Sequence, residues 1–309
     1  MPACAMTLLH HEGALGDVLL SLPCFSLLKQ EHPVLHFVGR RDVGTLLRDA
    51  GVVAEVSSSD NASYASLYAG EAAPEARSVL QRFSRAWVFT VHPDSAFVAA
   101  LRMVVPDTRT VVTVPPAGTP VHAAAFRLAQ LGGSADPSGQ LLVIPPRYGE
   151  RAAAMLARAG YDGCRPLIAV HPGSGGSAKC WPLENYLALI ERLQDKGGAF
   201  VVILTGPAEN ESFKARIDIF TRGRSGVLHV ADVALTTVAA LLGRCDLFIG
   251  NDSGIGHLAA VLGSSVLVLF GPTNPALWKP IGPQVTVIHA ALLAELPMDE
   301  VYARVPRIS

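Results

Sequence analysis

Residues 169–182 read AVHPGSGGSAKCWP, and this stretch indicates how the chain is built. An apolar run ends at His171, small residues follow, and Lys179 stands just before a predicted helix. Glycines let backbone N–H groups approach an anion closely, and a lysine adds a full positive charge. The P-loop pattern GxxxxGK[ST] is absent, because Lys179 is followed by Cys180. The stretch therefore predicts either a phosphate site or an ordinary strand-to-helix turn with an exposed lysine.

Apolar runs of this kind alternate with segments of helical periodicity along the chain. Near-continuous apolar strands separated by helices are typical of parallel sheets that are covered on both faces. The predicted strands lie at residues 6–11, 34–39, 52–57, 85–91, 109–114, 141–145, 167–171, 200–206, 227–232, 247–251, 266–271 and 285–290. Helical segments between them include residues 18–30, 122–132, 184–197, 237–245 and 255–263.

The number of strands indicates two domains. About a dozen strands exceed what one doubly wound sheet usually holds, and 309 residues suffice for two cores. A stretch rich in proline, glycine and charge at 145–166 offers a boundary. We therefore predict an α/β protein with two Rossmann-like domains, residues 1–150 and 151–309, whose parallel sheets face each other across a cleft. A ligand is expected in that cleft, outside the carboxyl ends of the strands.

The composition argues against nucleic-acid-binding, secreted and membrane-spanning proteins. The formal net charge is −1 and neither half of the chain is strongly basic, so no nucleic-acid partner is expected. The five cysteines lack CxxC spacing, which argues against a zinc site or a disulfide framework and fits a reducing cytosol. No lysine or arginine precedes the first apolar run, so we expect no secretory signal. No apolar run reaches the ~20 residues that cross a bilayer.

A second loop of interest, HHEGALGDVLLSLP at 10–23, places Asp17 where a predicted helix begins. Aspartate is a favoured N-cap, and capping is one explanation. The other is a carboxylate at the carboxyl edge of the first strand, where it could take a proton from an incoming hydroxyl. The nearby helix N-terminus would keep that carboxylate ionised. The segment GALGD is not GxGxxG, so it supports a dinucleotide site only weakly.

The strand at 200–206 ends in a third polar turn, with Gly206 at its end and Glu209 shortly after it. An acidic residue past a strand end is the usual way to hold ribose hydroxyls. The alternative is a glutamate that complements the dipole of the next helix.

The fourth loop follows the strand at 247–251. Asp252, Ser253 and Gly254 turn the chain into a helix, and such a turn directs N–H groups toward an anion. The alternative is that Asp252 or Ser253 only caps the helix, with His257 as an ordinary helix residue. In the second half of the chain, the loops together bring one lysine, two acids and several helix N-termini to one sheet edge, as a nucleoside diphosphate site requires.

The motifs GALGDVLLSLP, HPGSGGSAKCWP, GPAE and GNDSGIGHLAA…FGPTNP resemble those of glycosyltransferase family 9, the ADP-heptose:lipopolysaccharide heptosyltransferases. The resemblance implies a GT-B fold whose C-terminal domain binds the nucleotide-sugar donor and whose N-terminal domain binds a lipid-linked or core oligosaccharide acceptor. It implies inverting transfer without a metal or other cofactor. It also implies a cytoplasmic enzyme that contacts the inner membrane peripherally.

The resemblance implies roles for individual residues. Asp17 corresponds to the general base, Lys179 to a lysine on the donor phosphate, and Glu209 to the acid that holds the nucleoside. The implied donor site comprises Ser174, Gly175, Lys179, Asp252, Ser253, Gly254 and His257 at the diphosphate, and Gly206 and Glu209 at the nucleoside. Candidates for contact with an anionic acceptor are Arg40, Arg41, Arg48, Arg77, Arg82 and Arg85.

Three other functions fit parts of this pattern. A nucleotide-sugar epimerase on the same fold would need further acid–base groups, for which His171 and His257 are candidates. A non-catalytic nucleotide-sugar-binding protein would not need Asp17. An NAD dehydrogenase is the remotest alternative, because neither half shows GxGxxG at a strand end.

Overall fold

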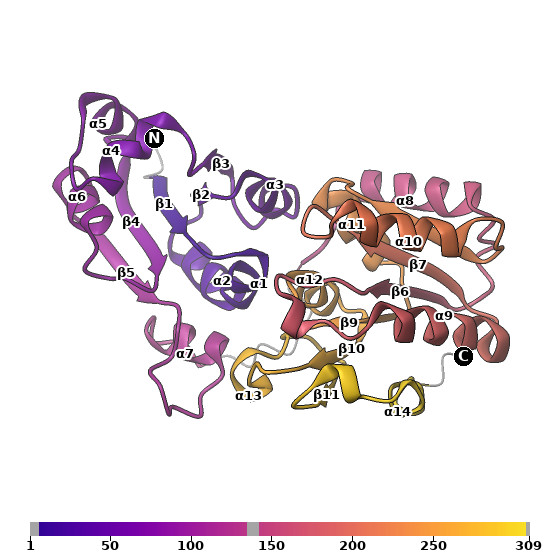
Figure 1. The fold of residues 1–309 in the computed structure, drawn as a ribbon. Helices are drawn as coiled ribbons and strands as arrows, with labels where there is room; N and C mark the ends of the chain where they lie inside the picture. The colour runs from indigo at the N-terminus through magenta and orange to yellow at the C-terminus, as the bar shows by residue number, and fades with distance from the viewer. Residues whose placement is uncertain (1–5, 135–141, 307–309) are drawn as a thin grey trace. The chain divides into compact units, whose positions relative to one another are not determined.

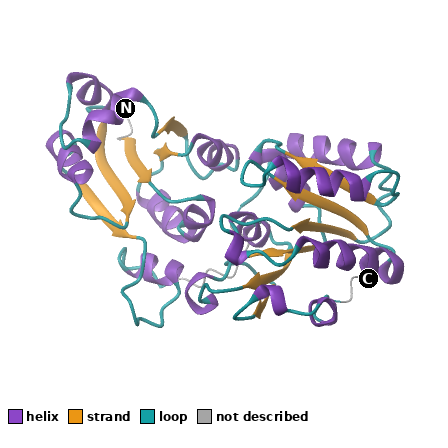
Figure 2. Ribbon diagram, in the orientation of Figure 1, coloured by secondary structure: helices purple, strands orange, loops and turns teal. Residues whose placement is uncertain are grey.

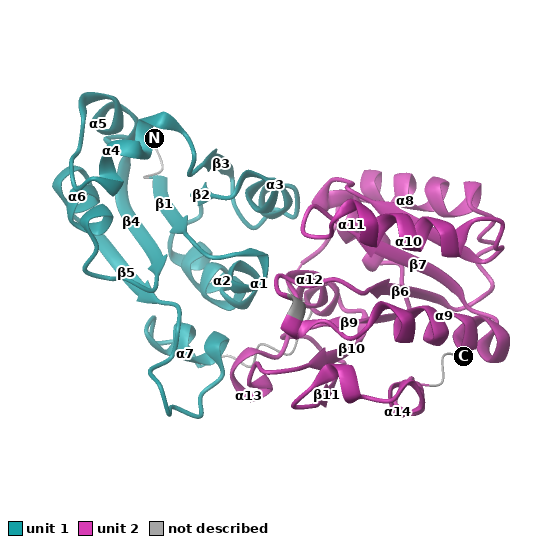
Figure 3. Ribbon diagram, viewed as in Figure 1, with its two compact units in different colours: residues 1–137 teal, residues 138–309 magenta. Residues whose placement is uncertain are grey.

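The computed structural model describes residues 6–134 and 142–306, apart from the side chain of residue 177. The chain divides into two compact units, Met1–Pro137 and Ser138–Ser309 (Figure 3). Each unit is an α/β domain in which helices lie on both faces of a parallel sheet (Figures 1 and 2). The predicted α/β class with two parallel sheets is confirmed.

The first unit contains a five-stranded sheet in the order β3-β2-β1-β4-β5. All neighbouring strands are parallel. Its elements are β1 (Met6–His11), α1 (Leu15–Leu20), α2 (Leu22–Glu31), β2 (Leu35–Gly39), α3 (Arg41–Asp49), β3 (Glu55–Ser58), α4 (Ala65–Tyr68), α5 (Pro74–Leu80), β4 (Phe83–Thr90), α6 (Ala96–Val104), β5 (Thr108–Val112) and α7 (Ala123–Ala129).

The second unit contains a six-stranded sheet in the order β11-β10-β9-β6-β7-β8, again parallel throughout. Its elements are α8 (Pro146–Arg158), β6 (Leu167–His171), the 3-10 turn η2 (Ser177–Lys179), α9 (Leu183–Gly197), β7 (Phe200–Thr205), α10 (Glu211–Thr221), β8 (Val227–Ala231), α11 (Leu235–Leu242), β9 (Leu247–Asn251), α12 (Gly254–Val261), β10 (Ser265–Phe270), α13 (Pro275–Trp278), β11 (Val285–His289) and α14 (Met298–Ala303).

The predicted strand at 141–145 does not form over its described residues, 142–145. Val143 is 68% exposed, and the two prolines that follow Ile144 have no N–H to give to a strand ladder. Pro146 instead opens α8, which packs on α11 in the second unit. The domain boundary that we expected at 150/151 therefore falls inside α8.

The predicted helix at 18–30 is two helices rather than one. α1 ends at Leu20 and α2 begins at Leu22, with Ser21 between them. Proline at position 23 lacks the N–H that a continuous helix would donate to the carbonyl of Leu19. The break matters for the site, because it changes which groups bond to the carbonyl of Asp17.

Each sheet has a topological switch point, which is the place between two neighbouring strands where the strand order reverses. In the first unit the reversal lies between β1 and β4, and in the second between β6 and β9. His171 at the end of β6 pairs with Gly250 near the end of β9, so the loops after these two strands begin side by side. A Cβ at Gly250 would lie 2.9 Å from the carbonyl oxygen of His171, so only glycine allows this approach.

Apolar side chains on the two faces of each sheet form the cores. In the second unit the core cluster includes residues of β6, β7, β9 and β10 together with Trp181 and Tyr186. None of the helices within the described ranges is long and apolar enough to cross a membrane.

Leu267→Ala is predicted to destabilise the second unit. Leu267 on β10 is fully buried, so the substitution removes burial and leaves a cavity, at a cost of about 2–5 kcal/mol. Urea denaturation of the intact chain measures the change. Leu292→Ala is the control, because that side chain is 60% exposed and should shift the free energy of unfolding by less than about 0.5 kcal/mol. Equal effects of the two substitutions would contradict the prediction.

Candidate functional site

Asn251, at the end of β9, is fully buried and ties together the loops at the second switch point. Its amide nitrogen donates to the carbonyl oxygens of Pro172 and Gly173, at 2.8 and 3.3 Å. Its carbonyl oxygen accepts from the backbone N–H of Trp181 at 3.0 Å and from the Tyr186 hydroxyl at 2.9 Å. One side chain therefore fixes both ends of the glycine-rich segment that follows β6.

The ends of that segment hold Lys179 against Asp252. The Lys179 ammonium lies 2.9 Å from a carboxylate oxygen of Asp252, and the Ser174 hydroxyl donates to the backbone carbonyl of Asp252 at 2.8 Å. The Asp252 side chain is 8% exposed, whereas that of Lys179 is 38% exposed. The structure thus brings these three predicted site residues into contact, with the cation on the more accessible side of the pair.

Two buried hydroxyls in neighbouring loops make no hydrogen bond within the part of the chain that the structure describes. They are Ser253 Oγ, directly before α12, and Thr273 Oγ1, in the turn after β10. A buried hydroxyl without a partner costs free energy unless a ligand or water satisfies it. Gly175, in the loop after β6, has no heavy atom within 4 Å of where a Cβ would be, and Gly254 begins α12. Polar groups and open backbone are therefore available to an anion here.

Glu209 lies next to the same loop. It is buried, and its carboxylate accepts from the backbone N–H of Gly206 at 2.7 Å. A Cβ built on Gly173 would lie 1.8 Å from Glu209 Oε1, so any other residue at position 173 would displace the carboxylate. The structure thus brings together Gly206 and Glu209, the two residues predicted to bind the nucleoside.

The histidines of this region are buried. Burial lowers the pKa of His171, although the nearby Glu209 opposes the shift. The ring of His171 is therefore neutral at pH 7, with Nδ1 at 2.9 Å from the carbonyl oxygen of Leu204. His257 is also buried, on α12. Neither position resembles an exposed acid–base group of the kind that an epimerase would need.

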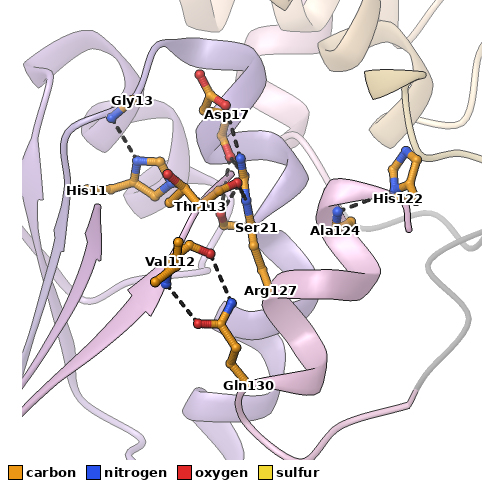
Figure 4. A network of polar contacts seen from close by, with 10 residues as sticks. All are labelled: His11, Gly13, Asp17, Ser21, Val112, Thr113, His122, Ala124, Arg127 and Gln130. Atoms are coloured by element: carbon orange, nitrogen blue, oxygen red, sulfur yellow. Dashed lines mark hydrogen bonds and ion pairs between the residues drawn. The ribbon is translucent and has the colours of Figure 1, made fainter. Parts of the chain in front are cut away.

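Asp17 lies in the first unit, where the structure gives it an unexpected partner. It stands in the first turn of α1, whose N-cap is Ala14, and no side chain caps that helix. The carboxylate instead pairs with Arg127, with 3.0 Å between Oδ1 and Nη2 (Figure 4). Arg127 lies on α7 and is fully buried, while the Asp17 side chain is 38% exposed. Burial lowers the pKa of Arg127, and Asp17 opposes that shift, so the arginine keeps its charge.

Arg127 was not among the residues predicted from the sequence to lie at the site. Of the six arginines expected near an acceptor, four form ion pairs with carboxylates of the first unit, namely Arg40, Arg48, Arg82 and Arg85. A signal for Arg127 was present, because it shares the buried stripe of α7 with Ala123, Ala124 and Leu128. A charged residue on an apolar stripe must find a buried partner, and the first strand's loop supplies one.

Comparison with known proteins assigns the second unit to a family. The model of Glycosyltransferase family 9 (heptosyltransferase) matches residues 140–301. No curated protein sequence matches the chain.

Solved structures extend the similarity of fold to the whole chain. A family 9 glycosyltransferase from Veillonella parvula shares 20% identity, with a TM-score of 0.78 over 98% of this chain and 96% of its own. The ADP-heptose lipopolysaccharide heptosyltransferase II of Escherichia coli shares 20% identity, with a TM-score of 0.71 over 96% and 97%. Heptosyltransferase WaaC of E. coli, solved with ADP, also shares 20% identity, with a TM-score of 0.69 over 96% and 98%. The two Rossmann-like domains thus have the GT-B fold.

Asn251→Ala is predicted to lower the free energy of unfolding by more than about 3 kcal/mol, because it leaves several buried groups without hydrogen bonds. Asn210→Ala is the matched control. That exposed asparagine accepts one bond, from the N–H of Phe213 at the start of α10, and its loss should cost about 1 kcal/mol. Denaturant titration of both variants measures the difference, and similar costs would argue against the role given to Asn251.

Proposed function

This chain belongs to glycosyltransferase family 9, and we propose that it transfers a heptose from ADP-heptose to the lipopolysaccharide core, with inversion at the anomeric carbon. The observation that supports this proposal most directly is the contact among Ser174, Lys179 and Asp252 at the switch point of the second sheet. A cation, open backbone N–H groups and unbonded hydroxyls at one sheet edge are what a diphosphate requires.

The second unit supplies the donor site in this proposal. Lys179, Ser253 and the start of α12 bind the diphosphate, with Ser174, Gly175, Asp252, Gly254 and His257 around them. Glu209, held by the N–H of Gly206, accepts hydrogen bonds from the nucleoside. ADP is the proposed nucleotide, because a relative of the same fold was solved with ADP and another is an ADP-heptose enzyme.

Asp17 of the first unit is the proposed general base. It takes the proton of the acceptor hydroxyl while that oxygen bonds to the anomeric carbon and the bond from that carbon to the diphosphate breaks. The sugar passes through an oxocarbenium-like transition state, as in other glycosyl transfers. ADP leaves with the bonding electrons. Lys179 and the helix N-terminus stabilise its growing negative charge, so this step requires no bound metal.

The acceptor in this proposal is an inner-core oligosaccharide on a lipid, which the enzyme reaches at the cytoplasmic face of the inner membrane. A lipid-linked acceptor remains at that surface, so peripheral contact suffices for the reaction.

Calorimetric titration of the purified chain with ADP, GDP and UDP, each with and without EDTA, tests the donor site. We expect ADP to bind most tightly and EDTA to have no effect. Lys179→Ala should weaken ADP binding by about 10- to 100-fold, which corresponds to one charge-assisted contact. Lys196→Ala, on the exposed end of α9, should leave binding unchanged. A preference for UDP or GDP, dependence on a metal, or full ADP binding by Lys179→Ala would each contradict this assignment.

Asp17→Asn is predicted to lower the kcat of transfer by about 100- to 10,000-fold, because an amide cannot accept the acceptor's proton. Its dissociation constant for ADP should stay within about twofold of the wild type, since Asp17 acts on the acceptor alone. The assay measures transfer of labelled heptose from ADP-heptose to heptose-free lipopolysaccharide core. Asp94→Asn, an exposed carboxylate of the same unit, serves as the control. A wild-type kcat in Asp17→Asn would remove the base from the mechanism.

A further inference from the structure

We propose that Arg127 is a positioning residue for catalysis, which holds the carboxylate of Asp17 in the orientation that proton abstraction needs. The inference rests on the proposed role of Asp17 as general base. Figure 4 shows the network that carries it, in which the arginine enters from α7 and reaches α1.

Each nitrogen of the Arg127 guanidinium has a partner. Nε donates to the carbonyl oxygen of Thr113, just after β5, at 2.8 Å. Nη1 donates to the backbone carbonyl of Asp17 and to Ser21 Oγ, the latter at 2.9 Å. Nη2 donates to Asp17 Oδ1 at 3.0 Å. The arginine therefore holds both the main chain and the side chain of Asp17, which fixes where Oδ2 can lie.

The break between α1 and α2 makes this double contact available. In a continuous helix the carbonyl of Asp17 would accept the N–H of Ser21, four residues later. Here the N–H of Ser21 bonds to the carbonyl of Val18, and its hydroxyl donates to the carbonyl of Asp17 at 3.1 Å. The carbonyl of Asp17 is thus free to accept from the guanidinium as well.

His11 completes the network behind Ser21. Burial lowers the pKa of His11 well below its usual value, and the charge of Arg127 lowers it further, so the ring is neutral. The N–H of Gly13 donates to Nδ1 at 3.0 Å, so Nδ1 is the acceptor and Nε2 carries the proton. Nε2 therefore donates to Ser21 Oγ at 3.1 Å, and the Ser21 hydroxyl proton is left for the carbonyl of Asp17.

The hydrogen bonds from His11 to Ser21, from Ser21 to Asp17 and from the Nη1 and Nη2 atoms of Arg127 to Asp17 all have one consistent donor direction. The position of Gly13 is equally constrained, because a Cβ there would lie 2.5 Å from the Cβ of Asp17 and 2.8 Å from the His11 ring. A buried network with a single arrangement of donors restricts its members to one geometry. Only Oδ1 of Asp17 is used by the guanidinium, and Oδ2 is assigned to the acceptor hydroxyl.

The charges support the same role. A fully buried guanidinium is stable only beside an anion, and Asp17 supplies that anion. Asp17 remains 38% exposed, so an acceptor can reach it while Arg127 stays inaccessible to water.

The test measures heptose transfer from ADP-heptose to heptose-free lipopolysaccharide core by the full chain. Arg127→Met should lower kcat by about 100-fold, a typical effect of a misplaced catalytic group, and leave the dissociation constant for ADP within about twofold. Arg127→Lys should recover part of kcat. Arg109→Met, an exposed pair with Asp107, is the control and should behave as the wild type.

A double-mutant cycle separates positioning from a general structural effect. If Arg127 acts through Asp17, the Asp17→Asn/Arg127→Met variant should turn over no more slowly than Asp17→Asn alone. The inference would be overturned if the losses of the two single variants multiply in the double variant, or if the kcat of Arg127→Met lies within threefold of the wild type. Should Arg127→Met fail to fold, Ser21→Ala, which removes only the hydroxyl of the network, should still lower kcat without weakening ADP binding, and an unchanged kcat there would overturn it.

Asp17→Asn also separates failure of the inference from failure of the proposed function. A fully active Asp17→Asn would overturn the base and the role of Arg127 together. An inactive Asp17→Asn beside a fully active Arg127→Met would overturn the role of Arg127 alone.

Discussion

The candidate donor site depends on the hydrogen bonds that the carboxamide of Asn251 makes with the loop after β6. Parallel strands bring the ends of β6 and β9 together, but they leave the chain that follows them free to move. By bonding to the carbonyls of Pro172 and Gly173 and to the N–H of Trp181, one buried amide fixes that chain at both ends. The position of Lys179 beside Asp252 is a consequence.

In the first unit, too, one buried polar side chain holds separate segments together, and there it is an arginine. There the guanidinium of Arg127 joins the chain after β5 to α1, as the amide joins β9 to the loop after β6. Both groups are fully buried, so each must be completely satisfied, and that requirement admits few alternative arrangements. The two candidate sites are therefore held by buried polar side chains that need not touch a ligand themselves.

Charge is distributed differently at the two positions. In the second unit the carboxylate of Asp252 is buried and the lysine is the more exposed partner, which suits an incoming anion. In the first unit the arginine is buried and the carboxylate of Asp17 is exposed, which suits a hydroxyl that must lose a proton. An ion pair thus leaves its cation the more exposed partner in the second unit and its carboxylate the more exposed partner in the first.

The two parallel sheets, the glycine-rich turn and the family motifs could be predicted from the sequence alone, because apolar runs and turn residues act over a few neighbouring positions. The sequence could not exclude a strand at 141–145 or detect the break at Ser21, since both depend on how prolines meet neighbouring elements. The contact between Arg127 and Asp17 could be found only in the folded chain, because the two residues lie 110 positions apart. The arginine's place on an apolar stripe signalled a buried partner, but contacts across the fold select which one.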